Sequence, residues 1–149
     1  MNLNDRVAMG LIAGLTAGVA MNVVNLAAFY SGIGELRYLD WAAIVIYGTK
    51  PVSFAEAIFA LMVQIIFVGI LGVVFAYLIR AISSRNLLLR GWLFGAAVWF
   101  SLYGIAFLFN VQQTIPVRLD TALNDFVGAS VFGLVLAAVL RRLAERTTV

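Results

Sequence analysis

Residues 7–30 read VAMGLIAGLTAGVAMNVVNLAAFY and carry the clearest signal for the fold. This stretch contains no charged side chain and exceeds the roughly 20 apolar residues that a helix needs to cross a bilayer. It is also longer than the core of a signal peptide, which is about 7–15 apolar residues. We therefore interpret residues 7–30 as a retained first membrane span.

The rest of the chain has the same character. Of its 149 residues, 64% are hydrophobic and 11% are charged, whereas soluble domains average about 45–50% and 25%. This composition excludes a soluble globular domain, a disordered tail and a nucleic-acid-binding arm. We predict an all-α membrane protein, with residues 1–149 forming a single integral membrane domain of four transmembrane helices in an antiparallel bundle.

Apolar stretches and their flanking residues predict spans at about 7–30, 54–79, 88–109 and 122–140. Ser53 and Glu56 form a capping-box pattern at the start of the second span. The link between the second and third spans is short, which predicts that these two spans form an antiparallel hairpin.

Residues 38–47 are apolar but too short to cross a bilayer, so we predict a short interfacial or re-entrant helix between the first two long helices. Tyr38, Trp41 and Tyr47 suit the headgroup level of the membrane. The segment either lies on the outer surface or folds over the mouth of a pocket.

Arginine and lysine positions predict the orientation of the chain. With four spans, one side carries seven arginines: Arg6, Arg80, Arg85, Arg90, Arg141, Arg142 and Arg146. The other side carries three basic residues: Arg37, Lys50 and Arg118. Because basic residues accumulate on the cytoplasmic side, we predict a cell-membrane protein with both termini in the cytoplasm. This placement also accounts for the basic composition without nucleic acid as a partner.

Small residues form stripes typical of a glycine zipper. They are Gly10, Gly14 and Gly18 in the first span, Gly69 and Gly72 in the second, and Ala129, Gly133 and Ala137 in the fourth. Such rows let helices approach closely in lipid. They pack the helices of one subunit or form an interface with another copy, and we predict a homo-oligomer or a partner membrane subunit.

Two short patterns occur twice along the chain. The pair Gly91 and Gly95 repeats the spacing of Gly10 and Gly14, and residues 133–141 repeat the pattern of residues 72–80. The repetition indicates either two parallel halves, each a helix pair, or only the general need for small residues where helices meet.

Polar residues within the spans are the candidates for a site, since they are costly in hydrocarbon. The candidates are Asn22, Asn25, Gln64, Trp99, Ser101, Tyr103 and Asp125. Most lie in the outer halves of the spans, which predicts an outward-facing polar pocket above an apolar inner half. The indole N–H of Trp99 needs an acceptor, and Gln64 and Ser101 are candidates.

The roles of these polar residues have alternatives. Asn22 and Asn25 either join helices by hydrogen bonds or line a solute site. Asp125 either complements the dipole of its helix or binds a cation or proton together with an asparagine.

The absence of cysteine and histidine excludes thiolate, haem and zinc chemistry of the usual kinds. The chain has no nucleophile–base set and no nucleotide motif, so we expect no enzymatic activity, no cofactor and no metal. The first interpretation is a structural, accessory or self-assembling membrane subunit in contact with membrane lipids. The alternatives are a channel or transporter for a small ion or solute, and a binder of a lipid or quinone-type ligand on an aromatic wall.

Overall fold

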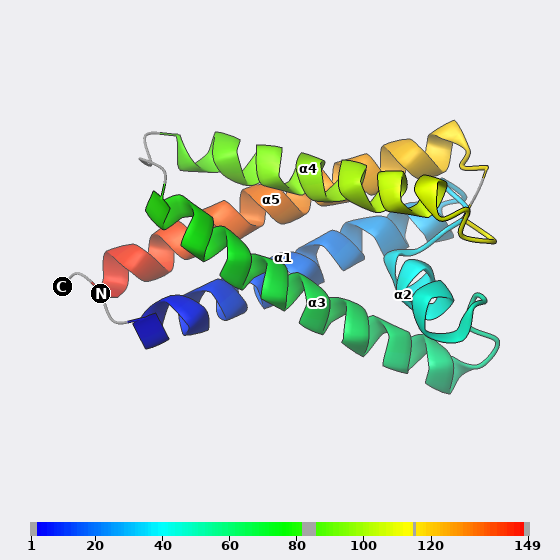
Figure 1. The fold of residues 1–149 in the computed structure, drawn as a ribbon, viewed down its shortest axis with the longest axis horizontal. Helices are drawn as coiled ribbons and strands as arrows, with labels where there is room; N and C mark the ends of the chain where they lie inside the picture. Colours follow the sequence, from blue (N-terminus) through cyan, green and yellow to red (C-terminus); the bar gives the residue numbers. More distant parts are fainter. Residues whose placement is uncertain (1–2, 82–85, 115, 148–149) are drawn as a thin grey trace.

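The computed structural model describes residues 3–81, 86–114 and 116–147, and in these ranges the secondary structure is entirely helical (Figure 1). The five helices are α1 (Leu3–Tyr30), α2 (Tyr38–Tyr47), α3 (Phe54–Ala81), α4 (Leu87–Leu108) and α5 (Leu119–Thr147). The four long helices are each long and apolar enough to cross a membrane. The predicted all-helical class and the four long apolar segments are therefore confirmed.

The helix ends show where charge and capping act. The fourth long helix begins at Leu119 and continues past Arg141 to Thr147, well beyond the predicted 122–140. Arginines therefore mark the end of the apolar segment but not the end of the helix. At the start of α3, Ser53 Oγ accepts a bond from the Glu56 N–H at 3.2 Å, whereas the Glu56 carboxylate binds the N–H of Val52, one residue before the expected partner.

The main helix contacts pair α1 with α3, α4 with α5, α1 with α5, and α2 with α3. The second and third long helices, α3 and α4, were predicted to form a hairpin packed on each other. This prediction is wrong, since α3 packs mainly on α1 and α4 packs mainly on α5. The start of α1 and the end of α5 lie at the same end of the molecule, opposite α2 (Figure 1).

The α1–α3 pair is a seam of glycines. A Cβ atom on Gly10 would lie 2.7 Å from the Cα of Val73, and one on Gly14 would lie 2.6 Å from the Val68 carbonyl oxygen. The backbone of Gly72 touches both of these glycines, and Gly18 lies against the Val68 side chain. Since no Cβ fits between these backbones, the two helices touch along their main chains.

The α4–α5 pair repeats this seam. Positions in α4 correspond to positions in α1 that are 81 residues earlier, so Gly91 and Gly95 correspond to Gly10 and Gly14. Positions in α5 correspond to positions in α3 that are 61 residues earlier, so Gly133 corresponds to Gly72. Gly91 lies against Gly133 and Ala137, and Gly95 lies against Ala129. The small-residue rows therefore pack helices of the same chain, in two pairs built alike.

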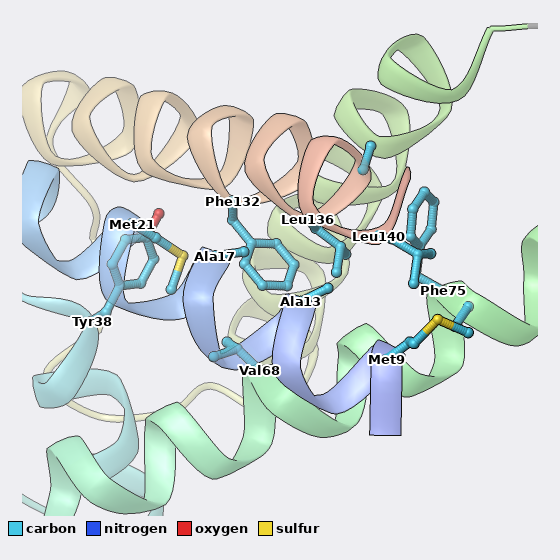
Figure 2. Packing of buried hydrophobic residues seen from close by; sticks show 12 residues of the cluster. Met9, Ala13, Ala17, Met21, Tyr38, Val68, Phe75, Phe132, Leu136 and Leu140 are labelled. Carbon is cyan, nitrogen blue, oxygen red and sulfur yellow. The ribbon is translucent and has the colours of Figure 1, made fainter. Parts of the chain in front are cut away.

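The two pairs join tightly along α1 and α5. Ala13 and Ala17 of α1 are completely buried, and they lie against Phe132 and Leu136 of α5 (Figure 2). The alanines leave room for the large α5 side chains, so the two helices pack closely. This contact is the centre of the hydrophobic core.

The corresponding contact between α4 and α3 stays open. By the same correspondence, Phe94 and Val98 of α4 are equivalent to the two buried alanines of α1. Phe75 of α3 is equivalent to Leu136 of α5. The rings of Phe75 and Phe94 meet with centroids 5.0 Å apart. Because bulky side chains replace alanines, α3 and α4 cannot close as α1 and α5 do, and a pocket remains between them.

Candidate functional site

The first turn of α2 enters the bundle. Arg37 precedes the helix, and its backbone N–H and its guanidinium both bind the buried carboxylate of Asp40, at 2.8 and 2.7 Å. The side-chain hydrogen bond with Asp40 raises the pKa of Arg37 above its ordinary value, so the guanidinium stays protonated. Tyr38 and Trp41 are buried. Both find polar partners inside the protein.

Those partners centre on Asp125 of α5, whose side chain is completely buried. Its Oδ2 accepts a hydrogen bond from the Tyr103 hydroxyl at 2.8 Å and one from Trp41 Nε1 at 3.3 Å. Its Oδ1 accepts a bond from Asn25 Nδ2 at 3.3 Å. One carboxylate therefore joins α1, α2, α4 and α5.

Tyr38 completes this network. Its hydroxyl donates to the backbone carbonyl of Asp125, and its backbone N–H donates to Asn25 Oδ1 at 3.0 Å. Burial raises the pKa of Tyr38 above its ordinary value near 10, and the charge of Asp125 adds to this effect. The hydroxyl therefore stays protonated and acts as a donor. The start of α2 is thus held by hydrogen bonds that it donates to α1 and α5.

A second polar contact lies between α1 and α3. Asn22 Nδ2 donates to Gln64 Oε1 at 2.8 Å and to the Gly18 carbonyl at 2.8 Å. In the correspondence between the two helix pairs, Asn22 is equivalent to Tyr103 and Gln64 is equivalent to Asp125. The two helix pairs therefore each hold one interhelical hydrogen bond at the same position.

The other predicted site residues lie elsewhere. Ser101 is exposed on α4. Trp99 Nε1 is buried and is served by neither predicted acceptor, and the indole packs against the ring of Tyr103, with centroids 5.0 Å apart. The indole that does find a serine is Trp92, whose Nε1 donates to Ser130 Oγ at 3.0 Å.

Sequence reasoning missed Tyr38 and Trp41 as members of the polar network. The available signal was two amphipathic aromatic residues in an apolar segment too short to span the membrane, close in the chain to a helix with buried asparagines.

An apolar pocket of about 280 Å³ lies beside this network, between α2, α3 and α4. Exposed side chains of α2 and α3, including Val45 and Phe67, belong to its lining. The pocket therefore opens sideways on the surface of the helix bundle. Apolar side chains make most of its wall, and Gln64 and Trp99 are among the few residues in the lining with polar groups.

The chemistry of the two features differs. The oxygens of Asp125 face N–H and O–H donors, which satisfy a carboxylate but repel a cation. Within the described ranges no cluster of three or more acidic side chains could hold a metal ion. The polar residues around Asp125 thus form an internal network, and the described pocket beside it is apolar.

Comparison with known proteins adds the family but no activity. No curated protein and no solved structure matches the chain. Residues 4–149 match one family model, so the chain belongs to DUF6789, a family of unknown function.

Proposed function

We propose that this protein is a non-enzymatic integral membrane protein that binds an apolar ligand from the bilayer in the pocket between α2, α3 and α4. In this proposal the four long helices cross the cell membrane as an antiparallel bundle with both termini in the cytoplasm. The excess of arginines on one side supports that orientation.

The observation that carries the proposal is the apolar pocket at the outer surface of the helices. Its volume of about 280 Å³ is close to the lower end of the range for small-molecule sites, about 300–1,000 Å³. A ligand dissolved in the bilayer reaches such an opening without entering water. The bulky side chains that hold α3 and α4 apart keep the pocket open in the protein itself.

Two other functions are less well supported. A conducting path needs polar groups along its length, whereas the core between α1 and α5 is filled by Ala13, Ala17, Phe132 and Leu136. Self-assembly through a glycine zipper needs free glycine faces, whereas the rows on α1, α3, α4 and α5 pack against each other. An accessory role with a partner membrane subunit stays a prediction.

The experiment fills the pocket by mutation. Val98 lines it from α4, and Val98→Trp places an indole in its space. Leu93→Trp is the matched control, because Leu93 is 51% exposed on the same helix and is outside the pocket lining. In lipid nanodiscs, native mass spectrometry should detect copurified or added apolar ligand on the wild type and on Leu93→Trp, and much less on Val98→Trp. Equal occupancy of all three proteins would exclude this pocket as the site.

A further inference from the structure

We infer that the pocket between α2, α3 and α4 holds the methyl-end half of a phospholipid acyl chain, whose ester and headgroup stay outside it. This inference rests on the proposed function and specifies its ligand. The chemistry of the wall, the depth of the pocket, its volume and its opening each point to such a chain.

The wall of the pocket presents almost no polar surface. The Tyr38 hydroxyl and Trp41 Nε1 both donate to Asp125 instead. Gln64 Oε1 accepts a hydrogen bond from α1 at 2.8 Å, and Trp99 Nε1 is buried within the protein. A carbonyl, hydroxyl or charged group in this space would lose its water without gaining a partner. The part of the ligand inside the pocket is therefore hydrocarbon.

The pocket lies at the middle of the long helices. The residues at the midpoints of three apolar spans belong to its lining, and they are Phe67 of α3, Val98 of α4 and Phe132 of α5. The lining on α3 runs from Val63 to Leu71, so it stays within about 7 Å of the midpoint along the helix axis. The ester groups of a bilayer lie about 15 Å from its centre, at half the hydrocarbon thickness. Only the far half of a lipid tail therefore reaches this depth.

The volume of the pocket agrees with its depth. A methylene group fills about the same volume as one molecule of liquid water, roughly 30 Å³, so a pocket of about 280 Å³ accommodates about nine methylene groups. This is about half of an ordinary phospholipid acyl chain. The headgroup half of the same chain would remain among its neighbours in the bilayer.

The opening of the pocket gives a lipid chain direct access. Val45 and Phe67 are 80% and 54% exposed, although both belong to the lining, and the exposed apolar surface of α3 continues at Ile70. The rings of Phe75 and Phe94, with centroids 5.0 Å apart, hold α3 and α4 apart, so the space does not close. An empty void deprives its lining of contacts. Acyl chains are the bulk medium around spanning helices, so mass action places one of them in the pocket.

Brominated lipids test this inference, because bromine quenches indole fluorescence at close range. The chain has three tryptophans, of which Trp41 and Trp99 line the pocket and Trp92 lies outside its lining. The reporter is therefore the full chain with Trp92→Phe. It is reconstituted in phosphatidylcholine vesicles whose acyl chains carry bromine near the methyl end, near the ester end, or not at all.

Two further proteins show whether the quenching chain lies in the pocket. The filled variant adds Val98→Phe and Val63→Phe to the reporter, and both positions line the pocket. The matched control adds Leu93→Phe and Met62→Phe on the same two helices, where each residue is 51% exposed and outside the lining. Since bulk lipid keeps the pocket occupied, methyl-end bromine should quench the reporter and the control at least about twofold more strongly than the filled variant. Ester-end bromine should quench all three proteins equally.

Two results would overturn the inference. One is equal quenching of the reporter and the filled variant by methyl-end bromine. The other is stronger quenching of the reporter by ester-end than by methyl-end bromine, a comparison that does not depend on how well a filled variant folds.

The mass-spectrometric comparison with Val98→Trp tests the proposed function separately. Displacement of a ligand in that comparison, together with equal quenching here, keeps the pocket as the site of another apolar molecule and refutes only the acyl chain. Absence of both effects refutes the proposed function and the inference together.

Discussion

The glycine seam between α4 and α5 makes a quantitative prediction for Gly91→Ala. The added Cβ would lie 2.6 Å from the Cβ of Ala137, and closer to the carbonyl oxygen of Gly133. Carbon atoms in favourable contact lie about 3.5–4.0 Å apart, so the helices would have to separate by roughly 1 Å along the seam. Overpacking of this kind costs about 1–3 kcal/mol.

Gly104→Ala is the control for this substitution. Gly104 lies in the same helix, and a Cβ there would meet no atom within 4 Å. Both variants gain the higher helix propensity of alanine, which is worth up to about 1 kcal/mol. Gly104→Ala should therefore be as stable as the wild type or more stable, and Gly91→Ala should be less stable than Gly104→Ala by about 1–3 kcal/mol.

The assay is reversible unfolding in mixed micelles by titration with SDS, followed by circular dichroism and tryptophan fluorescence. The quantity compared is the free energy of unfolding of the two alanine variants. Equal stabilities would refute the close backbone contact between α4 and α5.

Three further predictions concern the network, the seam and the orientation. Asp125→Asn leaves one acceptor oxygen where the carboxylate has two, so the new amide NH₂ faces either Asn25 Nδ2 or the donors of Trp41 and Tyr103. At least one buried donor then loses its acceptor, and the unfolding free energy should fall by about 1–3 kcal/mol; an unchanged value would show that the network does not stabilise the fold. Gly14→Leu should destabilise the monomer in the same titration, because its neighbours belong to α3 of the same chain; a loss of oligomers at unchanged monomer stability would instead place the seam between subunits. Since the chain has no cysteine, a membrane-impermeant maleimide should label Lys50→Cys in intact cells and label Arg142→Cys only after lysis; the reverse pattern would invert the proposed orientation.

The polar site was predictable in part. Asn25, Tyr103 and Asp125 are candidates from the sequence alone because polar groups in apolar helices need partners, and the structure brings these three together. The role of Trp41 was not predictable, because the same aromatic residue suits both the membrane interface and a buried carboxylate. Only the path of the chain between α1 and α3 turns this residue inward.

The helix pairing was harder to predict than the helices themselves. A short link suggested that α3 and α4 form a hairpin, but a link restrains only the ends of two helices. Glycine rows on α1 and α4 allow closer contact with α3 and α5, and close contact is the main source of helix association in lipid. The bulk of Phe94 then keeps the linked helices apart.

The four long helices of this protein were predictable from the length and composition of its apolar runs. Runs of about 20 apolar residues can satisfy their backbone polar groups in a bilayer only as helices, so composition and length were sufficient for the four long segments. Tertiary structure alone decided which faces meet, because contact depends on matching small residues of one helix with large residues of another. That matching closes the contact between α1 and α5, opens the one between α3 and α4, and thereby creates the pocket on which the proposed function rests.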